Sequence, residues 1–331
     1  MRESVVSPRR GFSLIELLVA MTILAMILLI VVGLTDFTAR AWRDARTRVD
    51  AFQAARNVFE NVTRLLSQAT LNTYYDYFDS AGRSSREPGF SGPHHYGRQS
   101  DLHFVSGKNL VPGQVTHAVF FQAPRGYAQS TNLQRLDTLL NACGFYIVHG
   151  PDAQRPAFLD SLPHAPPNEV RFRFMQFIQP RTAPVDQMTV YSDSGNTWFT
   201  APLNAGNPPV EEIASNIIAM VLRPRRSTGD EAHSTDAPLA PNYEYDSRNK
   251  NNPSTVHQLP PLIDVVLVAL DERSARRWEE EGLALPGDLF AQADKLDDDL
   301  RRLENDILAP QRLRYRIFRT TVALRSSKWS S

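Results

Sequence analysis

The longest hydrophobic stretch of the chain lies near its N-terminus. From Phe12 to Leu34 every side chain except Glu16 is uncharged, and most are apolar. At a rise of about 1.5 Å per residue, this stretch forms a helix roughly 34 Å long, which is enough to cross the hydrocarbon core of a bilayer. We therefore predict a transmembrane helix over residues 12–34.

Apolar positions continue beyond this stretch with the three- and four-residue spacing of one helix face. Residues 35–72 contain no proline and no glycine, and charged residues such as Arg43, Asp50 and Glu60 lie on the opposite face. The pattern predicts that the helix continues as an amphipathic segment whose apolar side packs on the chain's own sheet. That side consists of Trp42, Ala45, Val49, Phe52, Ala55, Phe59, Val62, Leu66 and Ala69.

Residues 73–100 have no such period. An aromatic cluster gives way to a stretch rich in glycine, serine and proline, which is typical of a long surface connection. The adjacent His94 and His95 suggest a metal ligand pair, but no further histidine or carboxylate stands beside them at ligand spacing. We predict a surface connection over this segment and no metal site.

Short hydrophobic runs separated by proline-rich connections follow and indicate antiparallel strands. The run at 262–270 is the strongest, and we expect the final run at 315–324 to lie antiparallel to it. The first residues of 211–222 are compatible with a helical turn. The predicted strands are 102–105, 115–121, 144–149, 170–174, 189–191, 197–199, 217–222, 262–270 and 315–324.

Two further segments depart from the strand pattern. Residues 223–261 are polar and rich in proline, asparagine and serine, which predicts a long and partly disordered loop. Residues 272–308 have helical spacing and dense charge, which predicts a helical insert before the last strand. Together with the long N-terminal helix, these patterns predict an α+β fold.

Composition and charge exclude several classes of function. The chain has 36 basic and 36 acidic residues, so its formal net charge is zero and we predict no nucleic-acid partner. The single cysteine, Cys143, cannot form an intrachain disulfide. It lies in a strand-like apolar run, which predicts a buried and unreactive thiol.

The sequence contains none of the spacings that mark common enzyme sites. There is no nucleophile elbow, phosphate-binding loop, zinc-protease motif or dinucleotide fingerprint. Asp294, Asp297, Asp298 and Asp299 form an acidic cluster, but their helical pattern without a loop glycine predicts a solvated helix face instead of a calcium site. We predict no catalytic residue, no cofactor and no metal.

The residues that begin the transmembrane segment carry a more specific signal. Gly11-Phe12-Ser13-Leu14-Ile15-Glu16-Leu17-Leu18-Val19-Ala20 resembles the prepilin N-terminus of type IV pilins and type II secretion pseudopilins. This resemblance implies that a prepilin peptidase cuts between Gly11 and Phe12 and methylates the new N-terminal Phe12. It also implies that Glu16, the fifth mature residue, pairs with the Phe12 amine of a neighbouring subunit during assembly.

Two simpler interpretations compete with the prepilin motif. A basic leader followed by an apolar run is also typical of a secretory signal peptide or a plain signal anchor. The run is too long for a signal peptide, and no small-residue cleavage site follows Leu34. A plain anchor needs neither the Gly11–Phe12 junction nor Glu16, so the prepilin interpretation is favoured.

The resemblance also implies an organisation and a location. A pilin-like fold would comprise a leader at 1–11, a transmembrane helix at 12–34, its amphipathic continuation at 35–72, and a periplasmic β-rich domain at 73–331. The chain would then be a single-pass protein of the inner membrane. Its partners would be the peptidase, other pseudopilin subunits, the inner-membrane assembly platform and the lipid bilayer.

Within this class, the length and the late strand pair are most similar to the large minor pseudopilin J of type II secretion. Residues 258–261 and the tail from Tyr315 to Ser330 also resemble the Verru_Chthon cassette protein C family. We therefore expect a minor pseudopilin of a type II secretion-like pseudopilus. A minor pilin of a type IV pilus or DNA-uptake system stays open, as does a signal-anchored protein with a periplasmic binding or enzymatic domain.

Overall fold

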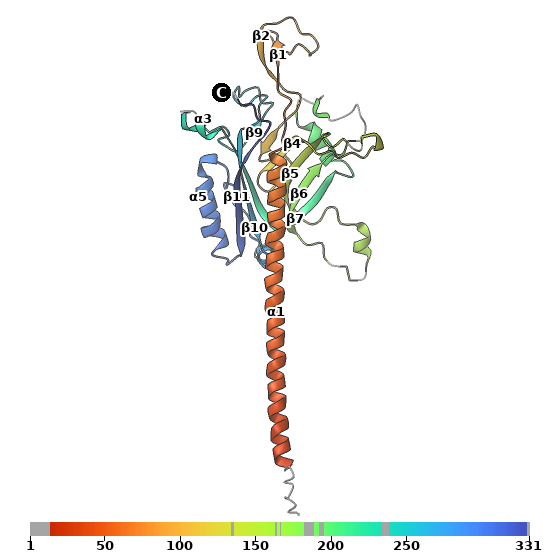
Figure 1. Cartoon of the computed structure of the whole chain (residues 1–331), viewed down its shortest axis with the longest axis vertical. Helices are drawn as coiled ribbons and strands as arrows, with labels where there is room; N and C mark the ends of the chain where they lie inside the picture. The colour runs from red at the N-terminus through yellow and green to blue at the C-terminus, as the bar shows by residue number, and fades with distance from the viewer. Residues whose placement is uncertain are drawn as a thin grey trace, which may run out of the picture. The chain divides into compact units, whose positions relative to one another are not determined.

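The computed structural model describes residues 14–133, 136–162, 164–165, 167–181, 189–191, 195–233 and 238–329. A long apolar helix is followed by antiparallel β-sheets with several short helices, so the fold is α+β as predicted (Figure 1). The chain divides into two compact units, residues 1–50 and residues 51–331. The second unit contains the sheets and the hydrophobic core.

Helix α1 runs from Leu14 to Leu66. Its last turns belong to the second unit and pack on the core, with Val62 and Leu66 fully buried and the Phe59 ring 5.7 Å from that of Phe318. This confirms the amphipathic packing predicted for this part of the helix. The helix ends at Leu66, earlier than the predicted residue 72, because the backbone N–H of Thr70 already donates to Gln122 in a sheet strand.

The larger sheet has six strands in the order β7-β6-β5-β4-β3-β9, and all neighbours are antiparallel. The predicted strand 144–149 is confirmed within β5, and the predicted strand 170–174 is confirmed as β6 except for its first residue. Strands β3 and β4 begin about three residues later than the predicted runs. The bounds are β3 Val105–Gly107, β4 Ala118–Pro124, β5 Leu140–Gly150, β6 Arg171–Ile178, β7 Val210–Ser215 and β9 Tyr245–Asp246.

A three-stranded sheet in the order β11-β10-β8 contains the late strand pair. Strand β10, Leu262–Leu270, is antiparallel to both β11, Tyr315–Ala323, and β8, Ile217–Arg225, so the predicted strands at 217–222, 262–270 and 315–324 are confirmed. Asp264 on β10 is buried and accepts hydrogen bonds from Arg223 on β8 and Thr321 on β11. One carboxylate thus joins all three strands.

Residues 73–100 form a hairpin, so the predicted surface connection is wrong here. Strand β1, Tyr74–Phe78, pairs with β2, His95–Gln99, as a separate two-stranded sheet beyond the C-terminal end of α1 (Figure 1). Tyr96 stacks on Tyr75 at a ring distance of 5.3 Å. Such cross-strand aromatic pairs stabilise a hairpin. The sequence pattern did not predict it, because a long loop rich in glycine and proline separates the two strands.

Two of the predicted strands are helical. Residues Thr189–Tyr191 form a 3₁₀ turn and Thr197–Leu203 form helix α2. The aromatic residues of α2 suggested a strand, but Phe199 stacks on Phe120 of β4 at 4.0 Å and is fully buried in this position. Packing therefore overrides local strand propensity. The predicted helical turn at the start of 211–222 is also wrong, because these residues pair with β6 as strand β7.

The segment 223–261 is more ordered than the predicted loop. It includes the end of β8, helix α3 at Thr228–His233 and strand β9. Tyr243 and Tyr245 are fully buried, and the Tyr245 hydroxyl donates to the carbonyl oxygen of Gln258. These tyrosines anchor a segment whose overall composition is polar.

The helical insert between β10 and β11 is confirmed, with a later start for its second part. Helix α4 spans Glu272–Glu280, and its N-cap Asp271 accepts a hydrogen bond from the Ser274 N–H. A 3₁₀ turn at Ala293–Lys295, helix α5 at Leu296–Arg302 and a π-helical turn at Leu303–Leu308 follow. Residues 289–292 are not helical, because Phe290 has a left-handed φ of 54° and its N–H donates to Asp299.

Candidate functional site

The predicted processing site lies at the start of α1. Gly11 and Phe12 lie outside the described residues, and Glu16 lies in the first turn of the helix. The positive end of the helix dipole favours a carboxylate at this position. Residues four apart share one face of a helix, so a continuous helix would place Glu16 on the face of residue 12.

The helix that carries Glu16 has the length and composition of a membrane span. From Leu14 to Trp42 its side chains are exposed and mainly apolar, over a helix of roughly 44 Å at about 1.5 Å per residue. Between Leu17 and Thr35 no charged residue occurs. The next charges, Asp36 and Arg40, lie one turn apart and form an ion pair at 3.8 Å. An inner-membrane anchor is therefore consistent with both sequence and structure.

Cys143 lies on β5 and is buried, as its apolar neighbours predicted. Burial raises the pKa of its thiol to about 12, although Arg125 acts weakly in the opposite direction. A thiol with this pKa is almost entirely protonated at neutral pH and is a poor nucleophile. We assign Cys143 to the core.

His95 is the first residue of β2 and His94 directly precedes it, and their rings are 5.9 Å apart in an edge-on arrangement. His95 stacks on Phe78 across the hairpin. Within the described residues, no group of three or more histidine, cysteine or carboxylate side chains is arranged to hold a metal ion. The structure therefore assigns the His95 ring a packing contact.

The acidic cluster of the helical insert is only partly a solvated face. Asp298 is exposed and pairs with Arg301, and Asp297 pairs with Arg319 of β11. Asp299 is buried instead, and its carboxylate accepts the N–H of Phe290 at 2.9 Å. The prediction was wrong for this residue, because the chain before α5 folds back over the first turn of the helix.

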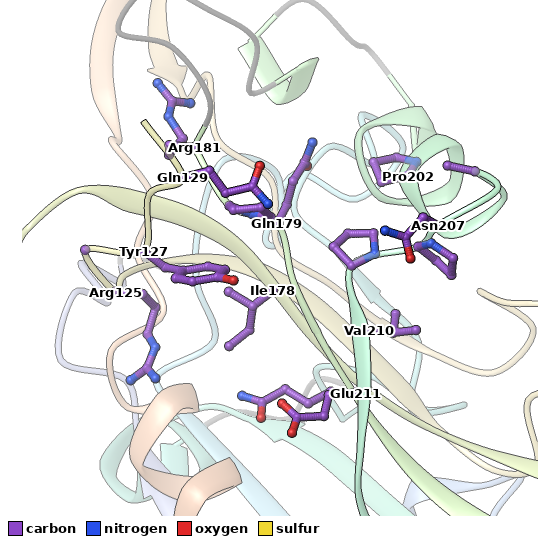
Figure 2. Close-up of a pocket in the computed structure, with 16 residues that line it drawn as sticks. Arg125, Tyr127, Gln129, Ile178, Gln179, Arg181, Pro202, Asn207, Val210 and Glu211 are labelled. Atoms are coloured by element: carbon purple, nitrogen blue, oxygen red, sulfur yellow. The ribbon is translucent and has the colours of Figure 1, made fainter. Parts of the chain in front are cut away.

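One feature of the described structure had no signal in the sequence. A cavity of about 930 Å³ lies where β4 and β6 end and β7 begins, and Figure 2 shows Arg125, Tyr127, Arg181 and Asn207 around it. These residues come from separate segments of the chain and share no motif. Sequence analysis alone could not bring them together.

Comparison with known proteins identified a sequence motif at the N-terminus of the chain. No curated protein and no solved structure matched the chain. A family model described as "Prokaryotic N-terminal methylation motif" matches residues 7–32, which include the Gly11–Phe12 junction, Glu16 and the first part of α1. The chain thus carries a prepilin-type N-terminal methylation motif on a long apolar helix, followed by an α+β domain.

Proposed function

We propose that this protein is a prepilin-type structural subunit. A prepilin peptidase removes residues 1–11, cleaving between Gly11 and Phe12, and methylates the amino group of Phe12. Residues 12–34 hold the mature protein in the inner membrane, and residues 73–331 lie in the periplasm. The observation that carries this proposal is the match of the methylation motif to residues 7–32, on an apolar helix that continues without a break to Leu66.

The same segment supplies a physical basis for assembly. Cleavage creates a cationic amino group on Phe12 inside the apolar layer, where an unpaired charge costs several kcal/mol. The carboxylate of Glu16 can neutralise that charge on a neighbouring helix. Such pairing favours an axial stagger that places the Phe12 of one subunit level with the Glu16 of the next.

Within this class we favour a minor pseudopilin of a type II secretion-like pseudopilus. Support comes from the length of the chain, the large β-rich domain and the late strand pair β10–β11, a layout that resembles the pseudopilin J type. A minor pilin of a type IV pilus or DNA-uptake system is the alternative. Genes for a secretin and an assembly ATPase beside several short prepilins would favour secretion.

Processing is tested by changing Gly11 to leucine. A bulky side chain at the scissile bond blocks the peptidase, so Gly11→Leu should keep the leader and stay unassembled in the inner membrane. Gly33→Leu is the matched control, because a Cβ at Gly33 meets no atom within 4 Å in the described structure. Mass spectrometry should find methyl-Phe12 at the N-terminus of the wild type and of Gly33→Leu. An intact Met1 in the wild type would instead identify a signal-anchored protein.

A further inference from the structure

The cavity at the ends of β4 and β6 is built from several distant segments. Its walls are the chain after β4, the end of β6 and the residues around it, the loop after α2 and the start of β7. In Figure 2, Arg125 and Arg181 lie on either side of Tyr127, and Pro202, Asn207 and Val210 stand across the cavity from them. A volume of about 930 Å³ is at the upper end of the range for ligand sites.

The two arginines of the cavity differ from other partly buried arginines of the described structure. Arg223 forms an ion pair with Asp264, and Arg173 forms one with Glu212. Within the described residues, Nε of Arg125 and both Nε and Nη1 of Arg181 are shielded from solvent and have no hydrogen-bond partner. A partly desolvated cation without a counter-charge is costly, so both positions favour an anion.

One carboxylate, Glu211, lines the cavity among the described residues, and it forms no ion pair with either arginine there. Its side chain is exposed at the start of β7. Among the described residues, the lining thus carries two cationic side chains and one anionic side chain. Its net cationic character and the planar geometry of guanidinium groups suit a ligand carboxylate, which arginine can bind through two parallel hydrogen bonds.

The lining also contains several neutral amide side chains. Gln129, Gln179 and Asn207 each offer both a donor and an acceptor, and Oε1 of Gln179 has no partner within the described residues. Four prolines in the lining contribute no backbone N–H. Side chains that donate and accept side by side suit a ligand covered with hydroxyl groups. The prolines are Pro180, Pro202, Pro208 and Pro209.

Tyr127 has an exposed aromatic side chain and a backbone that is held by hydrogen bonds. About 49% of its area is exposed, while its backbone N–H and carbonyl are both bonded to the buried side chain of Asn141. The N–H of Arg181 also donates to the Tyr127 carbonyl at 3.1 Å. Asn141 bonds the Gln179 carbonyl as well, so one side chain holds together two of the segments that line the cavity. These bonds fix the backbone of Tyr127, and its exposed ring, with an apolar face and a polar hydroxyl, suits the face of a sugar.

We propose that this cavity binds an acidic oligosaccharide, with ligand carboxylates on Arg125 and Arg181, hydroxyl groups on the amide side chains and one sugar ring against Tyr127. An acidic peptide would use the same arginines and amides, but it has no sugar ring to place against Tyr127. This inference does not depend on the proposed function, because the cavity lies entirely within residues 51–331.

The test uses the full chain in detergent micelles and isothermal titration calorimetry. The probes are tetramers of galacturonic, mannuronic and glucuronic acid, the neutral tetrasaccharide maltotetraose, and tetraglutamate. At least one acidic tetrasaccharide should bind. Maltotetraose and tetraglutamate should each bind at least about tenfold more weakly, because maltotetraose has no carboxylates and tetraglutamate has no sugar rings or hydroxyl groups.

Variants locate the binding site. Arg125→Gln and Arg181→Gln should each weaken binding of the acidic tetrasaccharide by about tenfold or more. Both variants should keep the wild-type midpoint of thermal unfolding or raise it, since they remove unpaired charges. Arg301→Gln is the control, because Arg301 is exposed on α5 and pairs with Asp298. The proposal is overturned if none of the acidic tetrasaccharides binds, if tetraglutamate binds as tightly, or if the double arginine variant binds like the wild type.

Discussion

The backbone N–H of Leu222 on β8 donates to Nδ1 of the buried His117 across 3.0 Å. The other ring nitrogen, Nε2, lies 3.2 Å from the carbonyl oxygen of Phe290, which can only accept. The ring is therefore neutral, with its proton on Nε2. His117 directly precedes β4 of the six-stranded sheet, so this one side chain joins that sheet to the three-stranded sheet and to the helical insert.

Acid should destabilise the fold through this histidine. Burial is the main cause that lowers the pKa of His117 from 6.5 to about 4. Between these values the unfolded chain binds a proton that the folded chain does not, so stability is present above pH 6.5 and is lost as the pH falls toward 4. The loss from His117 is about 2 kcal/mol by pH 5. Thermal unfolding monitored by circular dichroism between pH 7.5 and pH 4.5 measures it.

His257 should add to the same acid sensitivity. Its pKa is also lowered to about 4, mainly by burial, and its Nδ1 accepts the N–H of Ser100. Asp79, with a pKa of about 2, titrates below this window and does not obscure it.

His117→Gln should lower stability at pH 7.5 and flatten the pH dependence. A variant with the wild-type slope would show that other groups cause the effect.

Gly144 on β5 should not tolerate a side chain. An added Cβ would lie 2.2 Å from Cδ1 of Phe120, whose ring is itself held against Phe199. Gly144→Ala should therefore lower the free energy of unfolding by about 1–3 kcal/mol through overpacking. Gly150→Ala is the matched control in the same strand, because its Cβ would meet nothing within 4 Å. Denaturant unfolding compares the two variants. Equal stability would show that the core around Phe120 can rearrange to accept the added methyl group.

The stability of the three-stranded sheet should depend strongly on the carboxylate of Asp264. Burial acts to raise its pKa, but hydrogen bonds from Thr321 and Arg223 outweigh burial and hold the pKa below its usual range. Asp264→Ala removes the counter-charge of Arg223 and the acceptor of the Thr321 hydroxyl, and it should cost about 3–5 kcal/mol of stability.

Asp297→Ala provides the comparison for Asp264, because it removes an exposed ion pair with Arg319 of the same sheet. That loss should be at most about 1 kcal/mol. Thermal unfolding of both variants at pH 7.5 measures the difference. Similar losses in the two variants would contradict the central role of Asp264.

Glu16 should be required for assembly but not for processing. The peptidase acts at the Gly11–Phe12 junction, so Glu16→Ala should be cleaved and inserted normally. Without the carboxylate, the Phe12 amine of a neighbour has no partner in the apolar layer. Crosslinking to other pilin-like subunits should therefore be lost.

Thr22→Ala is the control for Glu16→Ala in the same helix, because the Thr22 hydroxyl bonds to the carbonyls of Leu18 and Val19 of its own helix. It should be processed and crosslinked like the wild type. If fully processed Glu16→Ala also crosslinks normally, Glu16 only neutralises the terminus of its own chain.

Local patterns determined much of this protein from the sequence alone. The apolar run, the methylation motif and the strands at 262–270 and 315–324 depend on residues that are neighbours in the chain, so their spacing is visible without a structure. The buried Cys143 belongs to the same group, because its apolar neighbours already predict burial.

Other features depend on contacts between distant segments, and only the tertiary structure decided them. Helix α2 forms where its aromatic residues suggested a strand, because Phe199 packs on Phe120 and Trp198 donates to His103. The hairpin β1–β2 depends on rings that meet across a long loop. The cavity needs Asn141 to hold Tyr127 beside the end of β6. No local period encodes such contacts, because their free energy arises only when segments far apart in the chain become neighbours in space.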